Sequence, residues 1–334
     1  MEIAGCMLLI DLKRNGCEVF PIFVPNQSGL KSINFYLLKQ DHSLTLIDAG
    51  LNNEDCWNSL LSTLIRNGFR LEDMTEVLLT HHHNDHIGLV NKIVENHQIP
   101  IYASPHSIPR LKRDQAFLEM RVEFFAQLYK EMGCGETGET QVAFLRKAIQ
   151  KNKDQAIQTN IIELTNKKFL NFNVMQTPGH ASDQLAFHDT ANNWLFAGDL
   201  LIEHISSNAL VEPDLHGKRI HSLIQHSNSL ERCLSLNADL VFAGHGVLIE
   251  NPNPLFKKRL DRIEGKSLRL LQLIQSGIHT ASELAQTLYK KMYDQQFSLV
   301  MSEVIGHLDY LEVQEKIYKD LIEGIWHYSI ARKS

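Results

Sequence analysis

Four short apolar segments of this chain each end in residue types that bind metal ions, and this repeated arrangement restricts the fold more strongly than any bulk property. Strand ends that deliver nitrogen and oxygen ligands into neighbouring loops can hold a metal between rigid elements. In three of the four, a glycine precedes the ligand, which lets the backbone turn tightly beside a bound group. The four are residues 77–79 before the run Thr80 to His86, residues 172–176 before Gly179-His180, residues 194–197 before Gly198-Asp199, and residues 240–243 before Gly244-His245.

The run at residues 81–86 places four potential ligands within six positions. Side chains alternate along an extended backbone, so His81 and His83 are predicted to point to one side and His82 to the other. Asp85 and His86 are expected in the turn that precedes a helix over residues 87–95. His82 is therefore left out of the predicted ligand set.

The candidate ligands supply five imidazoles and two carboxylates, which is enough for two adjacent divalent metals that share one carboxylate. Nitrogen and oxygen ligands without cysteine suit zinc, and also iron(II) or manganese. Two metals about 3.5–4 Å apart can hold a bridging hydroxide and polarise a carbonyl or phosphoryl oxygen, so that no Ser or Cys nucleophile is needed. Because the chain has 17 histidines, and a single histidine is more often a core residue than a ligand, the prediction depends on the joint pattern. The candidates are His81, His83, Asp85, His86, His180, Asp199 and His245.

Bulk composition is typical of a globular protein with room for two domains: 334 residues, 43% hydrophobic and 22% charged. A formal net charge of -6 argues against a nucleic-acid binder held by overall charge. The five cysteines are scattered without a CxxC pair, as in a reduced cytosolic protein. The apolar patch at residues 3–10 lacks the basic start of a signal peptide, and no apolar run approaches the roughly 20 residues of a membrane span. We therefore expect a cytoplasmic protein without membrane attachment.

Apolar periodicity predicts strands and helices in alternation up to residue 250, interrupted by a helical insert over about 105–159, and mainly helices afterwards. Residues 251–254, Asn-Pro-Asn-Pro, are typical of a linker, and Thr280 with Glu283 has the spacing of a capping box. Strands are predicted over residues 19–24, 33–38, 42–47, 77–80, 99–103, 161–164, 172–176, 184–188, 194–197 and 240–243. Helices are predicted over residues 55–67, 87–95, 221–236, 255–275 and 302–311, with two or three in the insert around a glycine-rich break at 133–138 and a late hairpin from 313.

The motif His81-x-His83-x-Asp85-His86, followed by His180, Asp199 and His245 behind strand ends, resembles that of the metallo-β-lactamase-fold hydrolases over residues 18–250. The resemblance implies an α+β fold, a four-layer αβ/βα sandwich of two mixed sheets packed face to face with helices outside. It also implies that His81, His83 and His180 hold one metal, that Asp85, His86 and His245 hold the second, and that Asp199 bridges them. Asp48, in an Asp-x-Gly after an early strand, matches a position expected to brace the ligand loop. Asp85 is expected in addition to orient the attacking hydroxide.

The C-terminal region is similar to the small winged-helix module of lactamase-β-like-2 proteins, some of which cut single-stranded RNA. The similarity covers residues 280–285, residues 302–311 and Lys316-Ile317. It predicts a catalytic domain over residues 1–250, which contains the insert, and a winged-helix-like helical domain over residues 255–334. The long insert departs from that pattern, so it leaves the substrate open.

Three functions remain compatible with the sequence. The first is a hydrolase of a small ester, thioester or lactone, in which insert aromatics form an apolar lid, unless they form the insert's own core. The second is a phosphodiesterase or endoribonuclease on single-stranded RNA, which would use a basic stretch over residues 257–269, unless that stretch is a solvated helix face. The third is a metal-bound sensor with a winged-helix reader, against which the intact ligand set argues. The lid candidates are Phe117, Phe124, Phe125 and Tyr129; the basic residues are Lys257, Lys258, Arg259, Arg262, Lys266 and Arg269.

Two subfamilies are excluded by particular positions. A secreted antibiotic-degrading lactamase would carry an export signal and usually a cysteine in place of Asp199. A flavodiiron oxygen reductase would carry glutamate in place of His83, together with a flavin domain. The expected partner is a small-molecule substrate, with RNA and a second copy of the chain as open alternatives.

Overall fold

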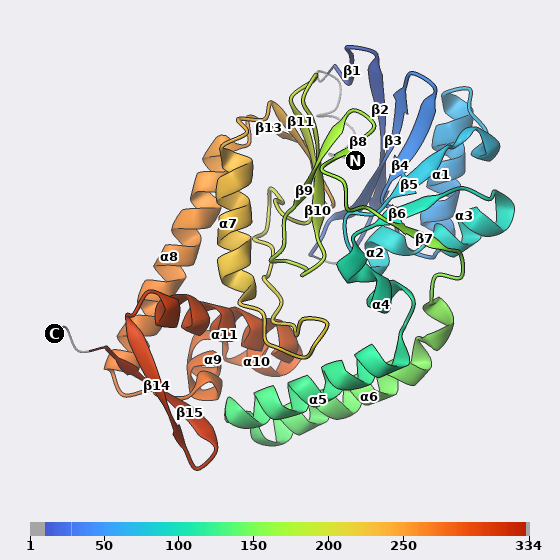
Figure 1. The fold of residues 1–334 in the computed structure, drawn as a ribbon. Coiled ribbons are helices and arrows are strands. Elements are labelled where there is room, and N and C mark those ends of the chain that lie inside the picture. Colours follow the sequence, from blue (N-terminus) through green and yellow to red (C-terminus); the bar gives the residue numbers. More distant parts are fainter. Residues whose placement is uncertain (1–10, 28, 332–334) are drawn as a thin grey trace.

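The computed structural model describes residues 11–27 and 29–331. Two β-sheets form the centre of its larger part, helices cover their outer faces, and a mainly helical region lies to one side (Figure 1). The apolar patch at residues 3–10 and Cys6 lie outside the described residues. Among the residues described, no helix is long and apolar enough to cross a membrane.

Within residues 11–27 and 29–331, the first sheet has seven strands that follow one another in chain order. The strands from β1 to β4 are antiparallel, and those from β4 to β7 are parallel. Because β4 and β5 are parallel neighbours, the residues that follow them, Asp48 and Thr80, emerge at the same edge. The strands are β1 (Lys13–Arg14), β2 (Cys17–Pro25), β3 (Ser32–Gln40), β4 (Ser43–Ile47), β5 (Glu76–Leu78), β6 (Ile101–Ala103) and β7 (Ile161–Glu163).

The second sheet has the order β13-β12-β11-β10-β9-β8. In this sheet β11 and β12 are parallel neighbours, so Asp199 and His245, which follow these strands, also emerge at one edge. The backbone N–H of Asn34 in β3 donates to the carbonyl of Gly244, 2.9 Å away, which joins the ligand edges of the two sheets. The strands are β8 (Lys168–Phe169), β9 (Phe172–Gln176), β10 (Leu185–Asp189), β11 (Trp194–Gly198), β12 (Leu240–Ala243) and β13 (Ile249–Glu250).

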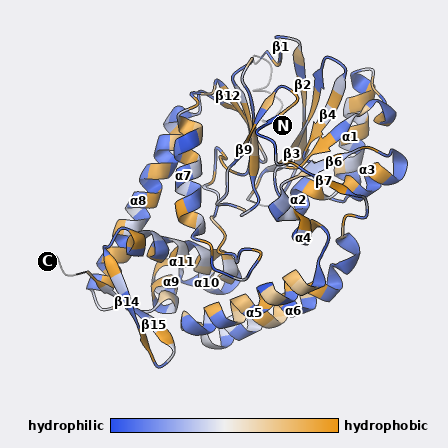
Figure 2. Cartoon of the chain, in the orientation of Figure 1, coloured by the Kyte–Doolittle hydropathy of each residue, from blue (hydrophilic) through white to orange (hydrophobic). Residues whose placement is uncertain are grey.

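The two sheets pack face to face through large aromatic side chains. Tyr36 of the first sheet makes edge contacts with Phe196 and Phe242 of the second, which stack on each other at 4.3 Å. All three are buried, and aromatic pairs at such distances contribute beyond their buried area. The hydropathy colouring shows apolar residues concentrated along the strands (Figure 2).

Helices form the outer layers, so the predicted four-layer sandwich is confirmed. On the first sheet, helices α1 (Glu54–Arg66) and α3 (Val90–Asn96) bury their apolar faces. On the second sheet, α7 (Ser222–Leu234) and α8 (Asn253–Gln275) do the same. Such stripes leave the opposite helix face to solvent.

The insert and the C-terminal region share one hydrophobic cluster, which was not predicted. Residues of α5 and α6, which run side by side (Figure 1), pack with residues of α8, α9 and α11. The division into domains at residues 250–255 stays a prediction, as does the winged-helix assignment. The insert contains α4 (Ile108–Leu111), α5 (Gln115–Glu131) and α6 (Gly135–Lys151); the C-terminal region contains α9 (Ala281–Tyr289), α10 (Lys291–Gln295), α11 (Phe297–Val313), β14 (Ile317–Ile322) and β15 (Ile325–Ile330).

Several predicted boundaries are wrong. The residues predicted as a linker, 251–254, include the start of α8 at Asn253, because proline is tolerated in the first helical turn. The glycine-rich break ends earlier, since α6 begins at Gly135. The helix predicted over residues 87–95 is two helices, α2 (Asn84–Ile87) and α3, so Asp85 and His86 lie within a short helix. A turn at residues 88–89 separates the two helices. Gly88 packs closely against a neighbouring loop there, since a Cβ on it would lie 2.2 Å from the backbone nitrogen of Asn52. The capping box at Thr280 is present.

Candidate metal centre

All seven candidate ligands lie in one cluster where the ligand edges of the two sheets meet. Three groups within the cluster have donor atoms that lie within 4.8 Å of one another. They are His81 with His83 and His180; His81 with His86 and Asp199; and Asp85 with His86 and His245.

The first group converges on Nδ1 of His83. Nε2 of His81 lies 2.9 Å from this atom and Nε2 of His180 lies 3.0 Å from it. Three ring nitrogens at these separations can occupy three corners of a tetrahedral site, the geometry that zinc prefers.

The third group, Asp85 with His86 and His245, contains a carboxylate beside two imidazoles. Asp85 lies 3.5 Å from Nε2 of His245 and 4.0 Å from Nε2 of His86. Asp199 lies between the first and the third group, since its Oδ2 is 3.5 Å from Nε2 of His180 and 3.2 Å from Nε2 of His245. The arrangement can accommodate one cation on each side of Asp199.

Asp48 connects two ligand positions from outside the cluster. Its Oδ2 lies 2.7 Å from Nδ1 of His86 and accepts the hydroxyl of Thr80 at 2.8 Å. The Thr80 oxygen lies in turn 3.0 Å from Nδ1 of His81. Since the Thr80 hydroxyl donates to Asp48, it can accept a hydrogen bond from His81. Both imidazoles then carry their proton on Nδ1, which leaves Nε2 free to bind a metal.

Backbone carbonyls hold two further imidazoles in the same tautomer. Nδ1 of His180 lies 2.9 Å from the carbonyl of Asn208, and Nδ1 of His245 lies 2.8 Å from that of Ser32. A carbonyl only accepts, so each ring must donate from Nδ1 and direct the lone pair of Nε2 toward the cluster.

The cluster fits a metal ion on two independent observations. Nε2 of His86, Nε2 of His245 and Oδ1 of Asp199 are buried without a hydrogen-bond partner, although native proteins almost always satisfy such atoms. A Cβ at Gly244 would lie 2.2 Å from Oδ1 of Asp199 and 2.7 Å from Cε1 of His86. The backbone there leaves room for the ligands and nothing larger.

Electrostatics within the cluster separate the imidazoles into two kinds. Burial, followed by neighbouring imidazoles, lowers the pKa of His81 and of His83 well below its usual value, which favours the neutral form that binds metals. Burial also lowers the pKa of His86, but Asp199 and Asp48 outweigh it and raise that pKa well above its usual value. The pKa of Asp199 would be raised by burial, but His86 and His245 hold it well below its usual range. Metal binding at protonated imidazoles releases protons.

His82 lies outside the cluster, as alternation predicts. Its Nδ1 is 2.6 Å from a carboxylate oxygen of Asp183, which is buried. Asp183 and Thr80 were missed by the sequence analysis, as were the carbonyls of Ser32 and Asn208. Backbone carbonyls carry no side-chain signature, and Ser32 and Asn208 are distant in sequence from His245 and His180, the ligands they contact.

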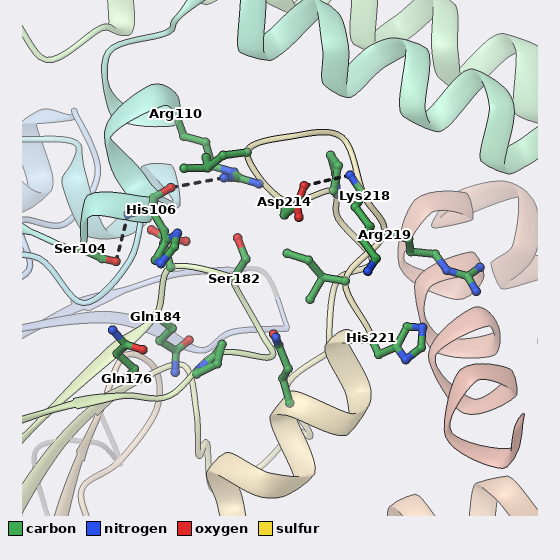
Figure 3. Close-up of a pocket in the computed structure, with 16 residues that line it drawn as sticks. Ser104, His106, Arg110, Gln176, Ser182, Gln184, Asp214, Lys218, Arg219 and His221 are labelled. Atoms are coloured by element: carbon green, nitrogen blue, oxygen red, sulfur yellow. Dashed lines mark hydrogen bonds between the residues drawn. The ribbon is translucent and has the colours of Figure 1, made fainter. Parts of the chain in front are cut away.

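A cavity of about 490 Å³ is drawn in Figure 3, and its lining includes Pro178, Ser182 and Asp183, which flank His180 in sequence. Polar and basic side chains line much of it, among them Arg110 from α4, Lys218 and Arg219 from the segment before α7, and Gln176 at the end of β9. The volume is in the range of small-molecule sites.

The insert aromatics do not form an apolar wall of this cavity. Phe125 and Tyr129 are buried in the cluster shared with the C-terminal helices, where Tyr129 contacts Phe297 at 5.0 Å. Phe124 packs against the same cluster. Phe117 is also buried, with the guanidinium of Arg110 4.7 Å from its ring centre.

The basic stretch of α8 is only partly a surface. Arg259 is buried and donates to the carbonyls of Ile202, Glu203 and Ile205 at 2.8 Å. Lys266 forms an ion pair with Glu303. Four exposed basic residues remain, namely Lys257, Lys258, Arg262 and Arg269.

Comparisons with known proteins agree on one family. The family model described as metallo-beta-lactamase superfamily matches residues 28–245. A probable metallo-hydrolase of Bacillus subtilis, YqjP, is 31% identical and covers 90% of this chain and 94% of its own length. An atrochrysone carboxyl ACP thioesterase of Aspergillus fumigatus is 23% identical and covers 84% of this chain and 77% of its own. A beta-lactamase-like protein 2 homolog of Drosophila melanogaster is 23% identical, with 88% of this chain and 86% of its own covered.

The fold has a close structural counterpart. The crystal structure of the metallo-beta-lactamase family protein TTHA1429 from Thermus thermophilus matches with a TM-score of 0.75 at 24% identity. The match covers 93% of this chain and 98% of that one, so it includes the insert and the C-terminal region as well as the two sheets.

Proposed function

Because this chain belongs to the metallo-beta-lactamase superfamily, we propose that it is a dinuclear metal hydrolase acting on a small ester, thioester or lactone. The family implies divalent metal ions, and the ligand cluster is the observation that carries the proposal. Its buried and unpartnered atoms on His86, His245 and Asp199 point to cations as the missing partners. Zinc is proposed first because the donors are imidazole and carboxylate, with iron or manganese as alternatives.

The residues divide into two proposed sites that share Asp199. His81, His83 and His180 would hold one metal, and Asp85, His86 and His245 the other. Two such ions lower the pKa of bound water to near neutral and polarise the oxygen of the scissile group. Asp48 would keep His86 in the correct tautomer.

Asp85 is proposed to take part directly in hydrolysis. Its side chain is 23% exposed, whereas that of Asp199 is 7% exposed, so an incoming water can reach Asp85. Its carboxylate would accept a hydrogen bond from the water and direct the oxygen at the acyl carbon. Water then adds to that carbon, the carbon–sulfur or carbon–oxygen bond breaks, and the proton passes to the leaving thiolate or alkoxide.

Small acyl substrates are favoured by two observations. The cavity beside the His180 loop has the volume of a small-molecule site. A relative that matches over 77% of its own length is named an atrochrysone carboxyl ACP thioesterase. Since polar groups line much of the cavity and the insert aromatics are buried elsewhere, the part of the substrate bound there is proposed to be polar.

Single-stranded RNA is the second candidate, supported by the similarity to beta-lactamase-like protein 2 homologs. The structure weakens its electrostatic basis, because Arg259 and Lys266 are engaged within the fold. An RNA substrate should then depend on the four exposed basic residues of α8, and its cleavage should fall steeply with salt.

The compartment and assembly are also proposals. Among the residues described, Cys17, Cys56, Cys134 and Cys233 are buried free thiols, which suits a reducing cytoplasm. Association with a second copy of the chain stays a prediction.

The test combines metal analysis with a parallel substrate screen. The reconstituted chain should bind about two divalent metals, and it should hydrolyse a thioester, ester or lactone faster than a phosphodiester or single-stranded RNA. Asp199→Ala should lose metal and activity together. Fewer than one metal per chain, or full activity in Asp199→Ala, would overturn the proposal.

A further inference from the structure

The segment of residues 207–211 contacts two candidate ligands. The carbonyl of Asn208 accepts a hydrogen bond from Nδ1 of His180, and the N–H of Leu210 lies 3.4 Å from the carbonyl of His180. The hydroxyl of Ser207 donates to the backbone carbonyl of Asp199. The segment therefore holds His180 through both its ring and its backbone.

The same segment is attached on its other side to the C-terminal helix α11. Nδ2 of Asn208 donates to the carbonyl of Leu299 at 2.9 Å, and the N–H of Val211 donates to the hydroxyl of Ser302 at 3.2 Å. Val211 is 2% exposed and belongs to the cluster formed by the insert and the C-terminal helices. Further along, Arg219 pairs with the buried Asp309 of α11 at 2.7 Å.

We propose that Asn208 is a positioning residue through which α11 sets the orientation of His180, an inference that rests on the proposed function. Its carbonyl fixes the ring of His180, and its side chain fixes that carbonyl relative to α11. The C-terminal region then supports the metal site, which a separable reader of nucleic acid would not do.

The geometry explains why a small displacement would matter. A ligand must be held within about 0.5 Å of its productive position, and loss of an outer partner typically weakens metal binding 10–100-fold. Without the bond to Leu299, the position of the Asn208 carbonyl would depend on the loop alone. The imidazole of His180 could then rotate away from His83, whose Nδ1 is 3.0 Å from its Nε2.

The alternative is that the bond to Leu299 only stabilises the fold. Asn91 provides the control, because its Nδ2 donates to the carbonyl of Ala156 at the same distance of 2.9 Å and its side-chain hydrogen bonds go to Ala156 and Gln158, not to a candidate ligand. A purely structural role would make Asn208→Ala and Asn91→Ala behave alike in metal binding, whatever they do to stability.

The experiment titrates Co²⁺ into the metal-free wild type, Asn208→Ala and Asn91→Ala, and records affinity and the visible absorption of each loaded protein. Asn208→Ala should bind one of two ions roughly tenfold more weakly and show a shifted spectrum, while Asn91→Ala matches the wild type. Ser302→Ala, which removes the acceptor of the Val211 N–H, should shift in the same direction and keeps the test decisive if Asn208→Ala does not fold.

The outcomes separate the two proposals. If the wild type binds two Co²⁺ ions and both Asn208→Ala and Ser302→Ala match it in affinity and spectrum, the positioning role is wrong while the proposed function stands. A wild type that binds no metal would overturn both.

Discussion

The carboxylate of Asp48 lies 2.7 Å from Nδ1 of His86, although 38 residues separate them. Both oxygens of Asp48 are used, because Oδ1 accepts the backbone N–H of Thr80 at 2.7 Å. The backbone of Asp48 adopts a positive φ of 59°, a conformation that non-glycine residues rarely take and that is tolerated where surrounding contacts enforce it. Asp48 thus joins the two loops that follow β4 and β5.

Asp48→Asn should weaken metal binding about 10–100-fold. An amide offers one acceptor and one donor, so whichever way it turns, its NH₂ faces an N–H or O–H donor of Thr80 or His86. Asp189→Asn is the control, since that buried carboxylate likewise accepts backbone N–H groups, from Ala191 and Asn192, but lies away from the cluster. Competition with a chromophoric chelator measures the affinities; equal affinity in the two variants would contradict the role of Asp48.

Gly244→Ala should abolish binding of at least one metal. Its Cβ would overlap Oδ1 of Asp199 at 2.2 Å, and the nearest side-chain atoms belong to ligands that cannot move without leaving their positions. Gly265→Ala in α8 meets nothing within 4 Å and should stabilise the protein by up to about 1 kcal/mol with unchanged metal content. Metal content per folded chain is read by elemental analysis, and two full sites in Gly244→Ala would show that the backbone there can yield.

The residues of the ligand cluster could be predicted from the sequence because each ligand lies within a few residues of a recognisable strand end. Strand ends at Ala197 and Ala243, each followed by glycine and a ligand, are recognisable within a few residues. Parallel pairing of β11 with β12 then brings those ends together, as topology requires. The four-layer sandwich was expected from the resemblance of the ligand motif to the metallo-β-lactamase-fold hydrolases, and the predicted alternation of strands and helices agrees with it.

The residues that orient the ligands could not be predicted from the sequence. The carbonyls that hold His180 and His245 belong to Asn208 and Ser32, and every residue has such a carbonyl. Periodicity also shows that a helix has an apolar face without showing what covers it. For this reason the insert was expected either as a lid or as its own core, and its packing against Phe297 and other C-terminal residues was missed.

Phe125→Ala tests that packing. Phe125 is 5% exposed and stacks on Tyr129 at 5.4 Å, so its truncation should cost about 3–5 kcal/mol of unfolding free energy. The KM of the folded variant should stay near wild type, because the residue does not line the cavity. Phe144 in α6 is 62% exposed, and Phe144→Ala should change stability by no more than about 0.5 kcal/mol. A raised KM without loss of stability in Phe125→Ala would restore the lid interpretation.

The surroundings of Glu212 predict how the stability of the protein depends on pH. Its carboxylate is buried between Arg110 and Arg121, with Oε2 3.2 Å from the first guanidinium and 2.7 Å from Nε of the second. Burial alone would raise the pKa of Glu212, but Arg121 and then Arg110 outweigh it and lower the pKa from 4.5 to about 2. A depressed folded pKa contributes stability that is complete above the unfolded pKa near 4.5 and is lost as the pH falls through about 2.

Glu212→Gln should therefore destabilise the protein by about 3–5 kcal/mol at neutral pH, because the buried guanidinium of Arg110 and the partly buried guanidinium of Arg121 lose their counter-charge. The difference from wild type should shrink as the pH falls from about 5 toward 2, where Glu212 itself becomes neutral. Urea unfolding at several pH values measures it. The exposed pair of Glu123 and Arg146, 2.8 Å apart, is the control, and Glu123→Gln should cost less than about 1 kcal/mol at every pH. A deficit in Glu212→Gln that stays constant across this range would show that the loss comes from packing and not from charge.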